Sequence, residues 1–170
     1  MIGHALALLA LLPLALAPDA LAPDALAPDA LAGPPRGAPA GALVASVDSE
    51  VAARALATPE PTGRVRIDLQ RGLDAIDWPR EGVRGPVALH AVLARAESTA
   101  ERDRSRASCT IRAVVRGADG ALLAVVSGSA RGEDRPGARA SLEREVLLAA
   151  ANQLTASVPE AVRRARGATR

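Results

Sequence analysis

The pattern of apolar and polar positions becomes regular from residue 64 onward. Residues 64–70 alternate charged or polar side chains with apolar ones, and this alternation predicts a half-buried strand. Residues 71–86 are rich in turn-forming residues. Val87 to Glu97 is a second strand candidate, although its alanine content leaves a helix open. The polar, charged stretch 98–108 predicts a long exposed loop.

The clearest local pattern in the chain is a hairpin. Cys109 to Arg116 and Leu122 to Ser129 are both strand-like, and residues 117–120 between them contain Asp119-Gly120. Asp-Gly between two strand-like runs is typical of a tight β-turn. Cys109 alternates with Ile111, so we expect its thiol to point inward as a small apolar group.

A helical period follows the hairpin. Residues 132–137 break the strand pattern, and Ser141 is placed to cap a helix over residues 142–155. One apolar face of this helix is formed by Leu142, Val146, Ala149, Ala150 and Leu154. Pro159 predicts the start of a second helix that runs through Ala165. Residues 64–170 are therefore predicted to form a small α+β domain, with an antiparallel sheet of about four strands and one or two C-terminal helices on one face.

The first 33 residues have a different character. An Ala/Leu run over residues 5–17 leads into three copies of Ala-Pro-Asp-Ala-Leu. The run has the length of a signal-peptide core and falls short of the roughly 20 apolar residues that span a bilayer. We expect export to the periplasm or medium, with cleavage after Ala32. No Lys or Arg precedes the run, so a low-complexity extension with a misplaced start codon, or an uncleaved membrane anchor, stays open.

Residues 34–63 are rich in Pro, Gly and Ala and predict an extended linker. Within this linker, residues 43–56 are predicted to form a short helix that ends before Pro59.

Composition excludes some classes of function. Trp78 is the only aromatic residue, which argues against single-stranded nucleic-acid binding, because such proteins stack bases on several aromatic rings. All 21 basic residues are Arg, and they alternate with acids, which is typical of a solvated mixed-charge surface. Cys109 is the only cysteine, so no disulfide can form within the chain.

Candidate chemistry is sparse, and we predict no catalytic, cofactor-binding or metal-ligating residue. His90 is the single histidine after His4, and a partly buried structural role fits its strand better than catalysis. An alternative, a small hydrolase-like enzyme, requires His90, Asp68 and Ser127 to converge. Asp74 and Asp77 beside Trp78 are predicted to be turn residues. Residues 128–132 (Gly-Ser-Ala-Arg-Gly) lack the pattern of a phosphate-binding loop.

A resemblance rests on residues 109–132 and on the helix from Ser141 to Ala156. This run resembles the second half of periplasmic α/β domains in cell-envelope lipoproteins of the curli-secretion and penicillin-binding-protein-activator types. In those domains a strand, an Asp-Gly turn, a strand ending in Ser-Gly-Ser-Gly and an Ala-rich helix recur. The resemblance covers residues 87–158. The chain departs from these domains in two ways. It lacks the lipid-anchoring cysteine, and its sequence pattern does not predict the N-terminal βα half.

The resemblance implies a non-catalytic accessory protein that binds another envelope component. The sequence analysis therefore predicts an exported protein of the cell envelope with a protein partner, no nucleic-acid ligand, and at most weak membrane association through its N-terminus. As the partner surface we expect an unpaired sheet edge, at Val87–Glu97 or at Arg64–Gln70.

Overall fold

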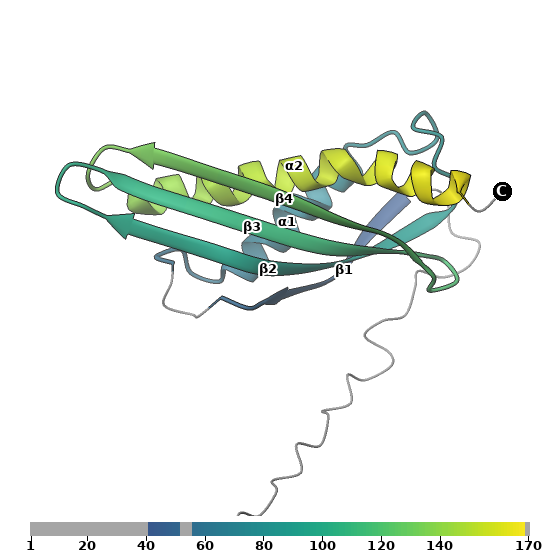
Figure 1. Cartoon of the computed structure of the whole chain (residues 1–170), viewed down its shortest axis with the longest axis horizontal. Coiled ribbons are helices and arrows are strands. Elements are labelled where there is room, and N and C mark those ends of the chain that lie inside the picture. The colour runs from purple at the N-terminus through teal and green to yellow at the C-terminus, as the bar shows by residue number, and fades with distance from the viewer. Residues whose placement is uncertain (1–40, 52–55, 169–170) are drawn as a thin grey trace, which may run out of the picture.

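The computed structural model describes residues 41–51 and 56–168, and these form four strands and two helices (Figure 1). The predicted signal peptide and its cleavage site lie outside the described residues and stay predictions. The elements in chain order are β1 (Gly41–Ser49), α1 (Pro61–Asp74), β2 (Pro86–Ala100), β3 (Ser105–Gly117), β4 (Leu122–Asp134) and α2 (Arg139–Gly167). The predicted α+β class is confirmed.

The sheet has the order β1-β2-β3-β4 and is mixed. β1 runs parallel to β2, whereas β2, β3 and β4 are antiparallel neighbours. The predicted hairpin around Asp119-Gly120 is confirmed as the β3–β4 connection. The strand predicted at Val87–Glu97 is also confirmed, within β2.

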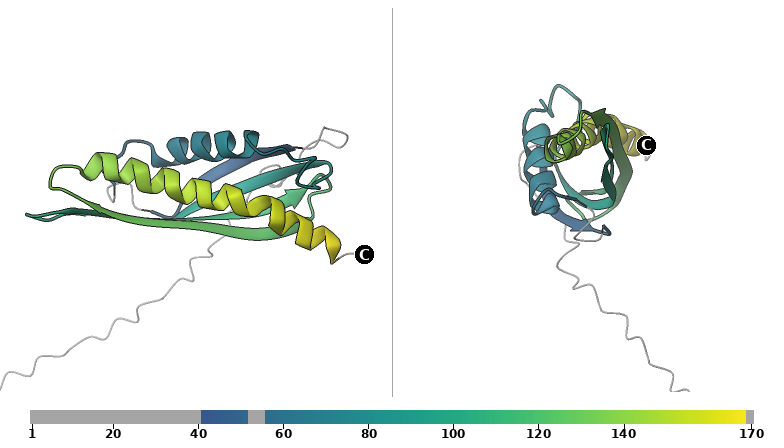
Figure 2. Two further views of the ribbon diagram at one scale, coloured as in Figure 1. Left: turned by 90° about the horizontal axis from the view of Figure 1, so that it is seen from above. Right: turned by 90° about the vertical axis from the view of Figure 1, so that its left-hand side faces the viewer.

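Both helices lie on the same face of the sheet (Figure 2). α2 packs across β3 and β4, and α1 packs on β1 and against α2. The core between the two layers is aliphatic apart from Trp78 and Cys109. Its fully buried members include Val65, Leu69, Leu73, Leu89, Leu93, Ile111, Leu147, Leu154, Val158 and Val162.

The prediction of a strand at residues 64–70 was wrong, because these residues belong to α1. Val65, Leu69 and Leu73 recur every four residues and are fully buried, whereas Ile67 is 54% exposed. The predicted strand required Ile67 to be buried on the same face as Val65 and Leu69. Pro61 in the first turn and the four-residue spacing fit a helix instead.

The prediction of a helix at residues 43–56 was also wrong, because residues 41–49 form β1 inside the stretch expected to be a linker. Val44 of β1 is buried in the core. β1 and α1 together supply a βα half before β2, which the sequence pattern had suggested was missing.

The stretch 98–108 is an extension of two strands and not a long loop. β2 continues to Ala100 and β3 begins at Ser105, leaving only residues 101–104 between them. Inward positions Ser105 and Ala107 are buried, while the charged residues point outward and pair across strands. A charged sequence can therefore form a strand when one of its faces is exposed.

Cys109 lies on the inward side of β3 and is 3% exposed, as predicted. Burial raises the pKa of its thiol to about 12. The thiolate, the reactive form, is therefore scarce at neutral pH.

α2 is the single C-terminal helix of the one or two expected, and the second helix start predicted at Pro159 is not found. Pro159 lies inside α2 and lacks the N–H that would bond to the carbonyl four residues earlier. Val158 and Val162 on either side are fully buried. Packing of these two side chains offsets the lost hydrogen bond and keeps the helix intact across Pro159.

The crossing of α2 over β4 requires glycine. A Cβ built on Gly128 would lie 2.1 Å from the carbonyl oxygen of Ala150 and 2.8 Å from the amide nitrogen of Leu154. At Gly132 a Cβ would lie 2.9 Å from Cδ1 of Leu142. The small inward residues of β4 therefore let the helix backbone approach the strand.

A buried carboxylate joins α2 to the segment that precedes α1. Glu143 accepts hydrogen bonds from the amides of Ala57 (3.0 Å) and Thr58 (2.7 Å) and from the Thr58 hydroxyl (2.8 Å). The Ser98 hydroxyl and the Arg139 guanidinium also donate to it. Burial would raise the pKa of Glu143, but these hydrogen bonds outweigh it and hold the pKa below its ordinary value of 4.5.

We expect Gly128→Ala to lower the free energy of unfolding by about 3 kcal/mol, because the added methyl overlaps the α2 backbone. Urea denaturation measures this. Gly41→Ala is the matched control, since nothing lies within 4 Å of its Cβ position, and it should change stability by less than about 1 kcal/mol. Equal effects of the two substitutions would contradict the close helix–strand contact.

We expect Glu143→Gln to lower the free energy of unfolding by about 3 kcal/mol, because an amide cannot accept hydrogen bonds at both of its terminal atoms. The folded-state pKa lies below the unfolded one. The carboxylate therefore stabilises the fold above pH 4.5 and loses this effect as the pH falls through the folded pKa.

Urea denaturation as a function of pH checks this expectation, with Glu145→Gln, an exposed residue of the same helix, as the control. If the stability of Glu143→Gln fell below pH 4.5 as steeply as that of the parent protein, another group would be responsible for the acid sensitivity.

Candidate functional site

No element among the described residues covers the face of the sheet opposite the two helices, and we call it the outer face. It is formed by the outward side chains of all four strands. From β1 and β2 these are Leu43, Ser46, Asp48, Ala88, His90, Val92, Arg95, Glu97 and Thr99. From β3 and β4 they are Arg106, Ser108, Thr110, Arg112, Val114, Arg116, Val125, Ser127, Ser129, Arg131 and Glu133.

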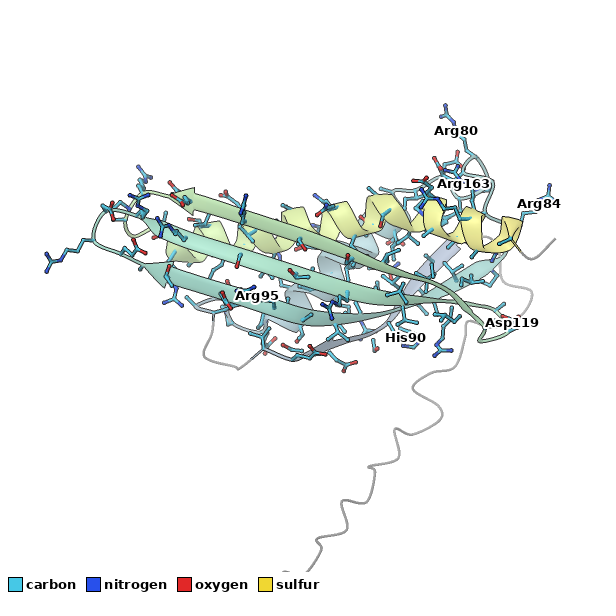
Figure 3. The ribbon with its side chains drawn as sticks, in the orientation of Figure 1. Arg80, Arg84, His90, Arg95, Asp119 and Arg163 are labelled. Atoms are coloured by element: carbon cyan, nitrogen blue, oxygen red, sulfur yellow. The ribbon has the colours of Figure 1, made fainter. Side chains whose placement is uncertain are left out.

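The two ends of the outer face differ in chemistry. Near the start of β1 and β2 the face is mostly apolar, with Leu43 52% exposed and Val125 66% exposed beside Ala88 and Val114, and Arg116 is the charged residue among them. We call this the apolar end. Toward the β2–β3 turn every outward side chain is charged or carries a hydroxyl, and we call this the polar end. His90 and Arg95 of β2 lie toward these respective ends (Figure 3).

His90 is more buried than the sequence predicted, at 8% exposed. Its Nδ1 lies 3.2 Å from the hydroxyl of Ser46, and Val114 faces it on β3. Burial lowers the pKa of His90 and nearby Arg116 lowers it further, while Asp48 opposes the shift. His90 is therefore neutral at physiological pH.

Two buried nitrogens beside each other on the outer face have no hydrogen-bond partner among the residues that the structure describes. They are Nε2 of His90 and Nε of Arg116, and Arg116 also donates from Nη1 to the Gly120 carbonyl oxygen at 2.8 Å. Buried polar groups of this kind are commonly satisfied by ordered water.

The residues proposed for the enzyme alternative do not come together. His90 is on the outer face of β2, and Ser127 is on β4, with β3 between them. Asp68 is buried on α1, on the opposite face, where it is bound by Arg64 (3.1 Å) and Arg71 (3.4 Å). The geometry therefore offers no nucleophile–base–acid set from these three residues.

The other sequence candidates have structural partners. Asp77 accepts a hydrogen bond from the Arg80 amide at 3.2 Å, and the indole nitrogen of Trp78 donates to the Leu73 carbonyl at 3.1 Å. Residues 128–132 lie within β4 and form no loop. Within residues 41–51 and 56–168, no group of three or more His, Cys, Asp or Glu side chains could hold a metal ion.

The sheet edges predicted as the partner surface are not available for strand addition. Val87–Glu97 lies in β2, which is paired on both sides, and Arg64–Gln70 lies in α1. The free edges belong to β1 and β4. Each is capped by one of the two glutamines of the chain, Gln70 and Gln153.

Gln70 of α1 bonds to the backbone of β1 as a neighbouring strand would. Its Oε1 accepts from the Val44 amide at 2.9 Å, and its Nε2 donates to the Ala42 carbonyl at 3.3 Å. On the other edge, Gln153 of α2 accepts from the Ser129 amide at 2.8 Å. Capping of unpaired edges protects a sheet from pairing with other chains, so the outer face is the better candidate surface.

The polar end of the outer face is hollowed. Two adjoining depressions of about 550 Å³ and 270 Å³ lie over β2, β3 and β4 and share Ser108 and Arg131. Sequence reasoning missed this feature. Polar residues at every second position could have indicated a polar strand face: Arg106, Ser108 and Thr110 in β3, and Ser127, Ser129 and Arg131 in β4. Which of these residues lie side by side depends on the register of the two strands, and the sequence does not give that register.

No helix among the described residues is long and apolar enough to cross a membrane. The fold and surface define a two-layer α+β domain with one covered and one uncovered sheet face.

Comparison with known proteins gives a fold likeness only. No protein-family model and no curated protein matches the sequence. One similar solved structure is that of a Caulobacter crescentus CB15 protein inferred to be a lipoprotein, with 12% identity, a TM-score of 0.42, and coverage of 71% of this chain and 91% of that one. Another is a minor lipoprotein of Acinetobacter baumannii, with 15% identity, a TM-score of 0.46, and coverage of 69% and 93%. At these scores no function follows from the likeness, and the resemblance to the curli-secretion and penicillin-binding-protein-activator types stays a prediction.

The two edge caps give a reciprocal prediction. Gln70→Ala should speed hydrogen exchange of the Val44 amide about tenfold and leave Ser129 unchanged, because it removes the acceptor of Val44 only. Gln153→Ala should do the reverse. Amide exchange followed by NMR measures both, and faster exchange across the whole sheet in either variant would indicate general loosening in place of a local cap.

Proposed function

We propose that this chain is an exported, non-catalytic accessory protein of the cell envelope that binds a protein partner through the outer face of its sheet. The observation that carries the proposal is the uncovered face, because a sheet normally buries one face and keeps the other polar. Here the uncovered side bears exposed Leu43 and Val125 at one end.

Export is supported by the sequence of residues 1–33. The Ala/Leu run and the small residues before Gly33 fit a cleaved signal, and the Ala-Pro-Asp-Ala-Leu repeats fit a spacer between the signal and the domain. The membrane-anchored alternative uses the same run without cleavage.

A binding role is supported by the surface and by the lack of converging chemistry in the described part of the chain. Leu43 and Val125 lie on either side of a neutral His90, so a partner that covers the apolar end would bury apolar area there. It would also cover the Arg116 guanidinium, which already donates a hydrogen bond to the Gly120 carbonyl oxygen. The polar end would form a solvated rim. The two capped edges support recognition by a face in preference to strand addition.

The experiment that tests the proposal is intact mass spectrometry of the native protein from separated cytosolic, periplasmic and membrane fractions. We expect a periplasmic species that begins near Gly33. A full-length species in the membrane would support the anchor, and a full-length species in the cytosol would overturn the proposed location.

His90→Ala in the same strain tests the enzyme alternative. A non-catalytic protein should keep its phenotype if the variant folds and still binds its partner. Loss of the phenotype with an unchanged unfolding midpoint and unchanged partner binding would contradict a non-catalytic role.

A further inference from the structure

The two depressions at the polar end form one trough across three strands, and it is large enough for a ligand. The larger depression, about 550 Å³, falls in the range of small-molecule sites, and the smaller one, about 270 Å³, adjoins it. The outward side chains that line the trough are Arg95, Glu97, Thr99, Arg106, Ser108, Thr110, Ser129, Arg131 and Glu133.

Most charges of the trough are already neutralised. Arg95 pairs with Glu97 at 3.0 Å, and Arg106 pairs with Glu133 at 3.0 Å. Arg131 lies between these pairs and forms no ion pair with any residue that the structure describes. The trough therefore contains one available guanidinium, which suits a single carboxylate or phosphate group.

Hydroxyl groups surround this guanidinium. Ser108 is the direct cross-strand partner of Arg131. One position along the sheet, the hydroxyls of Thr110 and Ser129 lie 3.2 Å apart, and Arg95 flanks Thr110 on β2. Hydroxyls both donate and accept hydrogen bonds, so they match a ligand that is itself rich in hydroxyls.

The trough has no aromatic platform. Trp78, the only aromatic residue of the chain, is buried in the core. A sugar bound here must be held by charge and hydrogen bonds and not by stacking. The hydrogen bond from Arg95 holds the pKa of Glu97 below its ordinary value, so Glu97 stays ionised as a further acceptor for ligand hydroxyls.

We propose that the trough binds an acidic saccharide, with the carboxylate or phosphate on Arg131 and the sugar hydroxyls on Ser108, Thr110 and Ser129. This site is separate from the apolar end assigned to a protein partner. It goes beyond the proposed function, and either can fail without the other.

The test is NMR titration of the full chain with glucuronate, glucose 6-phosphate and neutral glucose. We expect both acidic sugars, and not glucose, to shift the amides of Ser108, Thr110, Ser129 and Arg131. The stronger of the two acidic sugars identifies carboxylate or phosphate as the recognised group. Arg131→Gln should weaken binding about tenfold, since a charge-assisted contact is lost.

Two further variants sharpen the test. Arg102→Gln removes the same charge from the exposed β2–β3 turn and should leave affinity within about twofold. Thr110→Val keeps the shape and removes one hydroxyl, and should weaken binding by a few-fold. Inorganic phosphate that shifts the same amides as strongly as glucose 6-phosphate would overturn the saccharide assignment. Shifts spread over the surface, or unchanged affinity in Arg131→Gln, would overturn the site.

Discussion

The close approach of α2 to β4 at Gly128 determines the arrangement of the rest of the domain. No side chain separates the strand from the Ala150 carbonyl at the crossing, so α2 lies directly on the sheet. This position leaves room beside α2 for α1, which packs on β1 and on α2. Both helices therefore share one face, the aliphatic core forms between the layers, and the other face stays open.

The buried Glu143 carboxylate holds the segment that leads into α1. An isolated charge in this position would be strongly unfavourable, but two backbone amides, two hydroxyls and one guanidinium satisfy it. The same side chain thus links α2, the segment before α1 and β2. A domain whose core lacks Phe and Tyr gains in this network a specific contact that aliphatic packing alone does not supply.

Where the sequence pattern has one periodicity, it predicts the structure well. The β3–β4 hairpin and the inward Cys109 follow from local alternation and turn chemistry. The C-terminal helix was also predicted, but it begins at Arg139, and Ser141 lies inside it and does not cap it. At residues 64–70 two periodicities coincide, because Val65 and Leu69 fit both a strand and a helix. Only the exposure of Ile67 and the burial of Leu73 distinguish them.

The candidate sites could not be read from the sequence for a different reason. Arg131 lies beside Ser108 and the Thr110–Ser129 pair only because of the register in which β3 and β4 pair. The paired residues of the two strands are about twenty positions apart in the chain. Likewise, the burial of Asp68 depends on α1, the helix found where a strand was predicted.

The outer face is central to this account, because the helices leave it open, while Gln70 and Gln153 each bond to backbone groups at one of the two sheet edges. Site-specific photo-crosslinking in the native host tests it most directly, with the crosslinker placed at Val125 on the outer face and at Leu148, a 36% exposed residue of α2. The account predicts a discrete adduct with an envelope protein from position 125 and none from position 148. Adducts from position 148 alone would contradict it and place the partner on the helical layer.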